Sequence, residues 1–260
     1  MLNCDNIFPK VILEIGPFKV YFYGLIIALS ALLNIFALSY FRKIFPSKFV
    51  LKNQNEIIDF VFYTLLGGLL GARIFYILFY NLNFFLQHPL EMIKVQNGGM
   101  SVHGGLLGGV VTIFLFSKIK QYNFWKMTDL IVPFLALGLA LGRLANFVNG
   151  ELIGRETDFM YGCDFGDGLN RWPVQIFDSG KNFFIFAFTL SLLLKKEFKP
   201  GIISGLFLIL IGLFRFSLEF IRQPDPQIGF IYGFLTLGQI FAILTFILGL
   251  IIIVYKSLRK

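Results

Sequence analysis

Seven long runs of apolar residues dominate this chain and constrain its fold more than any other feature. A helix needs about 20 predominantly apolar residues to cross a bilayer, and each run is close to that length. The runs are continuous and lack the alternation of a barrel strand, so helices are the expected spanning form. The expected spans are residues 20–41, 57–80, 101–117, 127–147, 176–194, 202–220 and 236–255.

The overall composition leads to the same class of protein. The chain is 57% hydrophobic over 260 residues, whereas a soluble domain has about 45–50% apolar residues. We therefore expect an all-α integral membrane protein with about seven transmembrane helices, formed as one membrane domain over residues 1–260. No separate soluble domain and no nucleic-acid partner are expected. The first 19 residues carry charges and prolines, so no cleavable signal peptide is expected.

The distribution of basic residues predicts the orientation in the membrane. The loops after the first, third and fifth runs, together with the C-terminal tail, hold 13 Lys and Arg residues, and the opposite set of loops holds 7. Basic loops remain in the cytoplasm, so the N-terminus is expected outside and the C-terminus in the cytoplasm. Three further arginines, Arg73, Arg143 and Arg215, lie inside the expected spans.

Two segments on the outer side are longer than simple connections. Residues 81–100 are expected to form an interfacial arm with apolar anchors, and residues 148–175 a small outer head. The two cysteines, Cys4 and Cys163, do not form a metal-binding pattern. They can pair if both face an oxidising compartment.

Polar residues converge where the expected helices meet the outer leaflet. An arginine inside a membrane span is a functional-site hypothesis by default. Arg143 and Asn146 are one helical turn apart, as are Arg215 and Glu219, so each pair is expected on one helix face. The residues assigned to this end are Tyr23, Arg73, His103, Arg143, Asn146, Arg215 and Glu219. We expect them to line one polar chamber that opens toward the outer leaflet.

The charges of this chamber predict an anionic ligand. Glu151 and Glu219 can neutralise at most two of the three arginines. Guanidinium groups suit phosphate oxygens, and a phospholipid head group is the phosphate most available at this depth. The alternative interpretation is structural, with Arg143 and Arg215 paired to Glu151 and Glu219. The glycines at 67, 68, 71, 108 and 109 are interpreted as helix-packing positions.

Several motifs together resemble one family of bacterial membrane enzymes. They are Tyr23-Gly24, Gly71-Ala72-Arg73, the run from Gly98 to Gly105 around His103, the run from Gly142 to Arg155, Arg215 to Glu219, and Arg222-Gln223-Pro224-Asp225. In order and spacing the chain resembles the prolipoprotein diacylglyceryl transferases over nearly its whole length. Two positions differ, because Trp172 stands where members often have His, and Ile211 where some have Tyr.

The resemblance implies a reaction and a location. The family transfers the sn-1,2-diacylglyceryl group of phosphatidylglycerol to the thiol of the lipobox cysteine in a prolipoprotein, and glycerol phosphate leaves. The expected place is the bacterial cytoplasmic (inner) membrane, with the active site toward the periplasm. No cofactor and no metal are expected. Positions implied by the family are Tyr23, His103, Arg143, Asn146, Glu151, Gly154, Arg215 and Glu219.

Each implied position can be given a role. His103 is the expected base that deprotonates the thiol, and Arg143 and Arg215 are expected to stabilise the leaving phosphate. Tyr23, Asn146, Glu151 and Glu219 are expected to contact the lipid or to orient the arginines, and Gly154 to fix a turn. Arg73 is expected to bind lipid phosphate or to extend toward outer head groups.

Two other function classes remain as alternatives. An intramembrane serine protease would use Ser101 in Gly99-Met100-Ser101, but its only histidines would be His103 and His88, both poorly placed. An anionic lipid or solute carrier would explain the basic chamber without a base, but no inverted repeat is evident.

Overall fold

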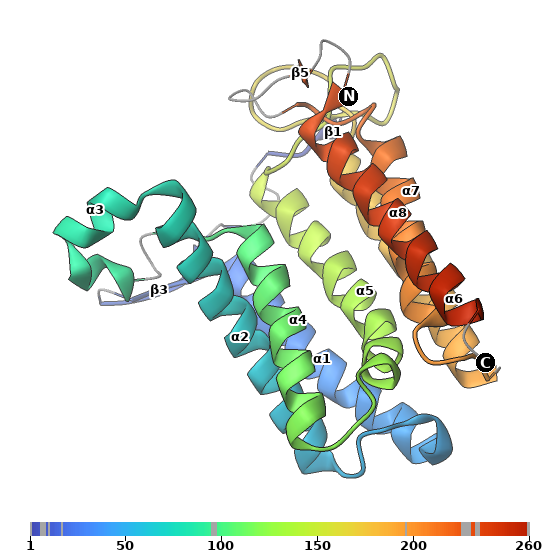
Figure 1. The fold of residues 1–260 in the computed structure, drawn as a ribbon. Helices are drawn as coiled ribbons and strands as arrows, with labels where there is room; N and C mark the ends of the chain where they lie inside the picture. The colour runs from blue at the N-terminus through green and yellow to red at the C-terminus, as the bar shows by residue number, and fades with distance from the viewer. Residues whose placement is uncertain are drawn as a thin grey trace. The chain divides into compact units, whose positions relative to one another are not determined.

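The structure is a computed structural model of the chain (Figure 1). It describes residues 2–5, 9, 11–16, 18–94, 98–195, 197–224, 230–231 and 235–258. The chain divides into two compact units, each treated on its own below. The first unit holds Met1–Ala37 and Asp129–Lys260, and the second holds Leu38–Thr128.

Each of the seven expected spans coincides with a helix. The helices are α1 (Phe22–Ile44), α2 (Gln54–Tyr80), α3 (Leu82–Gln87), α4 (Val102–Ile119), α5 (Phe124–Asn149), α6 (Val174–Lys195), α7 (Ile202–Leu218) and α8 (Leu237–Leu258), with short 3₁₀ turns η1 (Pro46–Lys48) and η2 (Pro89–Met92). Within the described residues, five helices are long and apolar enough to span a membrane, namely α1, α2, α5, α6 and α8. Residues His103–Ile119 and Ile202–Leu218 form shorter apolar helices. The all-α membrane fold is therefore confirmed.

The strands in the described part of the chain are short and form three two-stranded sheets. β1 (Leu2–Asn3) pairs in parallel with β4 (Cys163–Asp164), β2 (Val11–Ile15) is antiparallel to β3 (Phe18–Tyr21), and β5 (Phe230–Ile231) is antiparallel to β6 (Leu235–Thr236). Cys4, directly after β1, forms a disulfide with Cys163 in β4. The N-terminal segment is thereby tied to the head.

One basic residue used to predict the orientation in the membrane does not lie in a loop. Lys181 is one of the seven basic residues that the orientation argument assigns to the outer set of loops, but it lies within α6 and its side chain is 9% exposed. It carries no weight for the orientation, which remains a prediction.

In the second unit, glycines allow α2 and α4 to pack closely. A Cβ atom at Gly71 would overlap the carbonyl oxygen of Gly104, and one at Gly108 would overlap that of Gly67. Small residues allow this approach in membrane helices. The packing role expected for Gly67, Gly71 and Gly108 is confirmed. The prediction was wrong for Gly109, where a Cβ would meet no heavy atom within 4 Å, and at Gly68 a Cβ would make only an ordinary contact, 3.6 Å from the carbonyl oxygen of Gly105.

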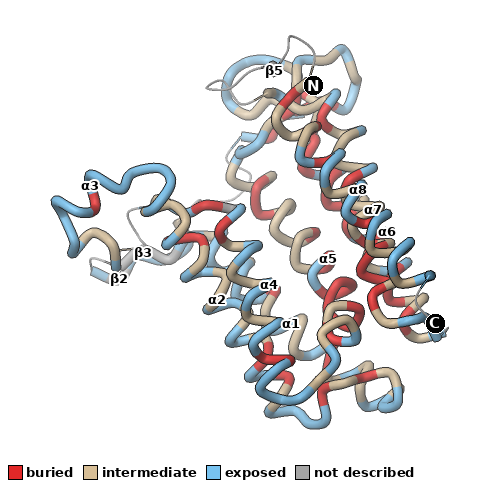
Figure 2. Tube along the Cα trace, viewed as in Figure 1, coloured by how far each residue is buried: buried red, intermediate tan, exposed pale blue. Residues whose placement is uncertain are grey.

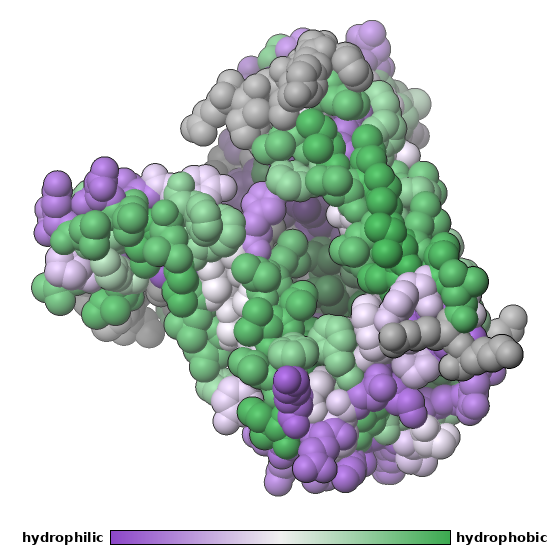
Figure 3. Space-filling view, in the orientation of Figure 1, coloured by the Kyte–Doolittle hydropathy of each residue, from purple (hydrophilic) through white to green (hydrophobic). Residues whose placement is uncertain are grey.

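In the first unit, α5 and α6 carry much of the buried surface (Figure 2). The buried residues of α6 recur every three or four positions and include the polar side chains of Asp178, Ser179 and Asn182. By contrast, α8 is mostly exposed and apolar, as Figure 3 shows in green along this helix. An apolar outer surface is suited to lipid, and the buried polar residues are directed inward.

Asp129 in α5 caps the beginning of α7 in the same unit. Its carboxylate accepts hydrogen bonds from Gly201 N at 2.6 Å, Ser204 N at 2.7 Å and Ser204 Oγ at 2.6 Å. Gly201, the N-cap residue, offers no side-chain cap of its own. Two of the amide groups that a helix start leaves without partners are thereby satisfied.

We expect Asp129→Ala to destabilise the protein in detergent by about 2–4 kcal/mol, because buried donors lose a charged acceptor. Thermal unfolding measures the effect, and Asp59→Ala on the exposed surface of α2 is the control. Equal unfolding temperatures for the two variants would contradict the capping role.

Candidate active site

The run from Gly142 to Arg155 ends α5 and begins the head. α5 stops at Asn149, and Gly150 follows with a φ of 65°, in the left-handed region that suits glycine after a helix. The amide of Glu151 then donates to the carbonyl of Asn146 at 2.9 Å. This turn brings Glu151 back beside the last turn of the helix.

Arg143 and Asn146 lie on one face of α5, as expected. Arg143 Nη1 donates to Asn146 Oδ1 at 3.3 Å, and Arg143 Nε pairs with Asp178 Oδ2 of α6 at 2.7 Å. Among the described residues, Nη2 of Arg143 has no hydrogen-bond acceptor. The ion pair at Nε and the hydrogen bond from Nη1 hold the guanidinium in place, and the N–H groups of Nη2 remain able to bind an anion.

Glu151 is not the ion-pair partner of Arg143 that the structural alternative proposed. Its carboxylate accepts from Asn146 Nδ2 at 2.9 Å and from Asn149 Nδ2 at 3.2 Å. Tyr23, at the beginning of α1, interacts electrostatically with both Glu151 and Arg143. Asp178 is therefore the carboxylate that pairs with Arg143, and Glu151 organises the two asparagines near Tyr23.

Arg215 and Glu219 form the second part of the site at the end of α7. Arg215 Nη2 pairs with Glu219 Oε2 at 2.7 Å, and Thr236 Oγ1 donates to Glu219 Oε1 at 2.9 Å. The expected pairing one turn apart is confirmed. Within the described part of the chain, the buried Nη1 atom of Arg215 has no hydrogen-bond partner.

Two residues that sequence reasoning did not select connect these parts. Asp178 Oδ1 pairs with Lys181 Nζ at 2.9 Å, while Oδ2 of the same carboxylate pairs with Arg143. Arg215 acts electrostatically on both Asp178 and Lys181. The sequence did contain a signal for them, because Asp178 and Lys181 are two charged residues three positions apart inside an apolar run. Such a pair is as unusual in a membrane span as a lone arginine.

Gly154 lies where the head contacts the segment after α7. It forms an antiparallel bridge with Arg222, and Arg155 N donates to Ile221 O at 2.9 Å. A Cβ at Gly154 would overlap the carbonyl oxygen of Trp172. Gly154 therefore permits a close backbone approach instead of fixing a turn. Asp225, the last residue of the Arg222 motif, is outside the described residues.

Trp172, one of the two positions at which the sequence departs from the expected pattern, has a packing role. Its ring stacks on Phe159 with centroids 4.8 Å apart. Ile211 lies in α7 and is partly buried. Nothing in the structure assigns either residue to the chemistry.

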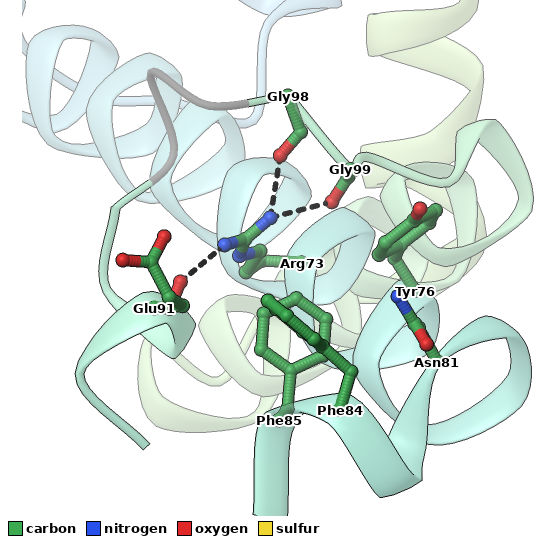
Figure 4. A pocket seen from close by; sticks show the side chains of 8 residues that line it. All are labelled: Arg73, Tyr76, Asn81, Phe84, Phe85, Glu91, Gly98 and Gly99. Atoms are coloured by element: carbon green, nitrogen blue, oxygen red, sulfur yellow. Dashed lines mark hydrogen bonds between the residues drawn. The ribbon is translucent and has the colours of Figure 1, made fainter. Parts of the chain in front are cut away.

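In the second unit, Arg73 holds the arm. Its guanidinium donates to the backbone carbonyls of Glu91, Met92, Lys94, Gly98 and Gly99, and its Cζ lies 5.0 Å from the ring centroid of Phe85. Figure 4 shows the bonds to Glu91, Gly98 and Gly99 in a pocket of about 310 Å³ that Arg73 helps to line. Five acceptors match the five N–H groups of a guanidinium, so the geometry favours anchoring of the arm.

Replacing Arg73 by lysine is expected to loosen the arm, since an ammonium cannot reach five carbonyls in a fork geometry. Hydrogen exchange should show amides of residues 90–94 and 98–101 losing protection by about tenfold or more. Arg42→Lys is the matched control, because the Arg42 guanidinium bonds to the carbonyl of Lys52, outside the arm. Unchanged protection in Arg73→Lys would contradict the anchoring role.

Ser101 and His103 lie at the beginning of α4. Ser101 is 5% exposed, and its Oγ accepts from Gly104 N at 3.4 Å as the helix cap. This role disfavours Ser101 as a protease nucleophile. His103 is exposed in the first turn of α4.

The fold and the cluster together define a class of protein. Arg143, Asp178, Lys181, Arg215 and Glu219 gather at the end of α5, the beginning of α6 and the end of α7, among helices suited to a membrane. Such a protein is an α-helical integral membrane protein with a cationic site fit for an anion.

The family follows from comparison with known proteins. The chain belongs to the prolipoprotein diacylglyceryl transferase family, whose model matches residues 10–255. It is 38% identical to a phosphatidylglycerol–prolipoprotein diacylglyceryl transferase of Rickettsia bellii, over 100% of this chain and 99% of that protein. Proteins of the same name from Francisella tularensis subsp. holarctica (37% identical, 98% and 95% covered) and Rickettsia africae (38%, 95% and 96%) are similarly related.

Proposed function

We propose that this chain transfers the sn-1,2-diacylglyceryl group from phosphatidylglycerol to the thiol of the lipobox cysteine of a prolipoprotein. Full-length relatives with that printed name support the reaction. The observation that carries it to this chain is the pair of arginines, Arg143 and Arg215. Each is held by a carboxylate at one edge and retains N–H groups for an anion.

The proposed reaction is a displacement at carbon. The lipobox thiol loses its proton, and the thiolate attacks the glyceryl carbon that is bonded to the phosphate oxygen. A C–S bond forms as the C–O bond breaks, and the electron pair leaves with glycerol phosphate. The leaving phosphate gains negative charge, so cations fixed beforehand lower the barrier.

Arg143 and Arg215 are proposed to stabilise that charge. Asp178 and Glu219 hold the guanidinium groups in place, which avoids reorganisation during the reaction. Tyr23, Asn146 and Glu151 are linked to one another and to Arg143. They are proposed to contact the head group of the lipid.

His103 is proposed as the base for the lipobox thiol. An imidazole accepts a proton near neutral pH, and this side chain is exposed. Gly154 is proposed to position the head that carries Glu151. Arg73 is proposed to act through the arm, because its N–H groups bond to the backbone there.

The proposed location is the bacterial inner membrane, with the site toward the periplasm. The Cys4–Cys163 disulfide supports an oxidising surrounding for the head. The reaction would then be the first step of bacterial lipoprotein maturation, carried out where exported prolipoproteins emerge.

The test is a transfer reaction with purified protein, phosphatidylglycerol and a lipobox peptide. Mass spectrometry should find a diacylglyceryl adduct on the peptide cysteine and an equal amount of glycerol phosphate. Lipid binding by folded protein without either product would contradict the transferase and favour the anionic lipid carrier.

A further inference from the structure

Lys181 is a buried cation at the site that none of the family motifs quoted above includes. It lies in the second turn of α6 with its side chain 9% exposed, beside an Asp178 side chain that is 4% exposed. Burying a charge is costly unless it is paired. A lysine at such a position therefore needs a specific partner. That partner is the Asp178 carboxylate, which also pairs with Arg143.

The Asp178 carboxylate is shared between two cations. Oδ1 lies 2.9 Å from Lys181 Nζ, and Oδ2 lies 2.7 Å from Arg143 Nε. One negative charge cannot neutralise two positive charges. If Lys181 were neutral, Asp178 would neutralise Arg143 alone, and the attraction of Arg143 for a phosphate would weaken.

The charges of the ion-paired side chains support this division. Arg143, Lys181 and Arg215 supply three positive charges, and Asp178 and Glu219 supply two negative charges, so one positive charge is in excess. Glu151 is exposed and bonded to two asparagines, which leaves its charge to be screened by solvent. A phosphodiester with one negative charge would balance the excess.

We infer that Lys181 is a positioning residue that sets the preference for an anionic head group over a zwitterionic one. By sharing Asp178 it keeps Arg143 electropositive and correctly oriented for the lipid phosphate. This inference rests on the proposed function, because it assigns the electrostatic requirement of the same site.

The test compares Lys181→Met, Lys181→Arg and the double variant Lys181→Met/Asp178→Asn. Native mass spectrometry of the protein in detergent measures binding of phosphatidylglycerol against phosphatidylethanolamine. Lys195→Met is the matched control, since Lys195 lies in the last turn of the same helix and is exposed. Unfolding temperatures are measured in parallel, and only folded protein is compared.

Lys181→Met is expected to lower the preference for phosphatidylglycerol by about tenfold, the size of one charge-assisted interaction. Lys181→Arg should retain the preference, and the double variant should recover part of it because the charge excess is restored. Lys195→Met should behave as the wild type. In the transfer reaction, the KM for phosphatidylglycerol should rise more than kcat falls.

An unchanged preference in folded Lys181→Met would overturn the inference. So would an equal loss of both lipids with a lower unfolding temperature, which is the result of a purely structural role. The transfer reaction of the wild type is a separate readout. Its failure would remove the proposed function, whereas a failure confined to Lys181→Met would remove only this inference.

Discussion

Arg143→Lys is expected to lower diacylglyceryl transfer by about 10²–10³-fold, comparable to losing one preorganised donor to a developing oxyanion. Lysine keeps the charge but lacks the planar fork. Arg143 uses Nε for Asp178 and Nη1 for Asn146. The three N–H groups of an ammonium share one nitrogen, so they cannot span the positions of Nε, Nη1 and Nη2. The variant should remain inserted and folded because the charge balance is unchanged.

The measurement is the initial rate of adduct formation under saturating lipid. Arg42→Lys is the matched control, as Arg42 lies in the last turn of α1 and donates to the carbonyl of Lys52. Transfer within threefold of the wild type in Arg143→Lys would mean that a fork-shaped contact to phosphate is not required.

Gly154→Ala is expected to abolish measurable transfer and to destabilise the head by about 1–3 kcal/mol. The added methyl group would overlap the carbonyl oxygen of Trp172, which is backbone and cannot rotate away. On either side, Trp172 N donates to Arg155 O at 3.0 Å and Arg155 N to Ile221 O at 2.9 Å. The backbone segments at Gly154 and Trp172 would have to move apart, and the connection from Gly154 to Glu151 would shift with them.

Gly180→Ala provides the control for this variant. Gly180 lies in α6, and a Cβ there would have no heavy atom within 4 Å. Alanine should therefore stabilise the helix slightly. If Gly154→Ala had the activity and unfolding temperature of Gly180→Ala, the close approach at Trp172 would be unimportant.

The sequence predicted the features that follow from chain-local rules. Apolar runs predicted seven of the helices in the described residues, all except the short α3, and a spacing of three or four residues placed Arg143 with Asn146 and Arg215 with Glu219. Helical geometry alone decides these relations. No knowledge of the packing between helices was needed.

The partners across helices could not be predicted in this way. Asp178 of α6 is paired with Arg143 of α5 because those two helices present facing polar side chains, and spacing along one helix carries no information on that. Arg73 was expected near lipid phosphate, but it bonds to five carbonyls of the arm. Backbone acceptors are present in every sequence, so no side-chain pattern reveals them.

The disulfide could be predicted from the sequence only in part. The presence of Cys4 and Cys163 allowed a pair, and the parallel pairing of β1 with β4 brings them together. The two strands have two residues each, and the cysteines that they bring together are 159 positions apart in the sequence. Strands this short leave no periodic pattern, so the register could not be predicted from the sequence.

The most direct test follows the oxygen atom that joins glycerol to phosphate. Phosphatidylglycerol is labelled with ¹⁸O at the bridge between the diacylglyceryl carbon and phosphorus, and one turnover is run with a lipobox peptide. Displacement at carbon predicts that all of the label leaves in glycerol phosphate and that the peptide thioether carries none. Unlabelled glycerol phosphate would show that the carbon–oxygen bond stays intact, and it would contradict a thiolate attack assisted by Arg143 and Arg215.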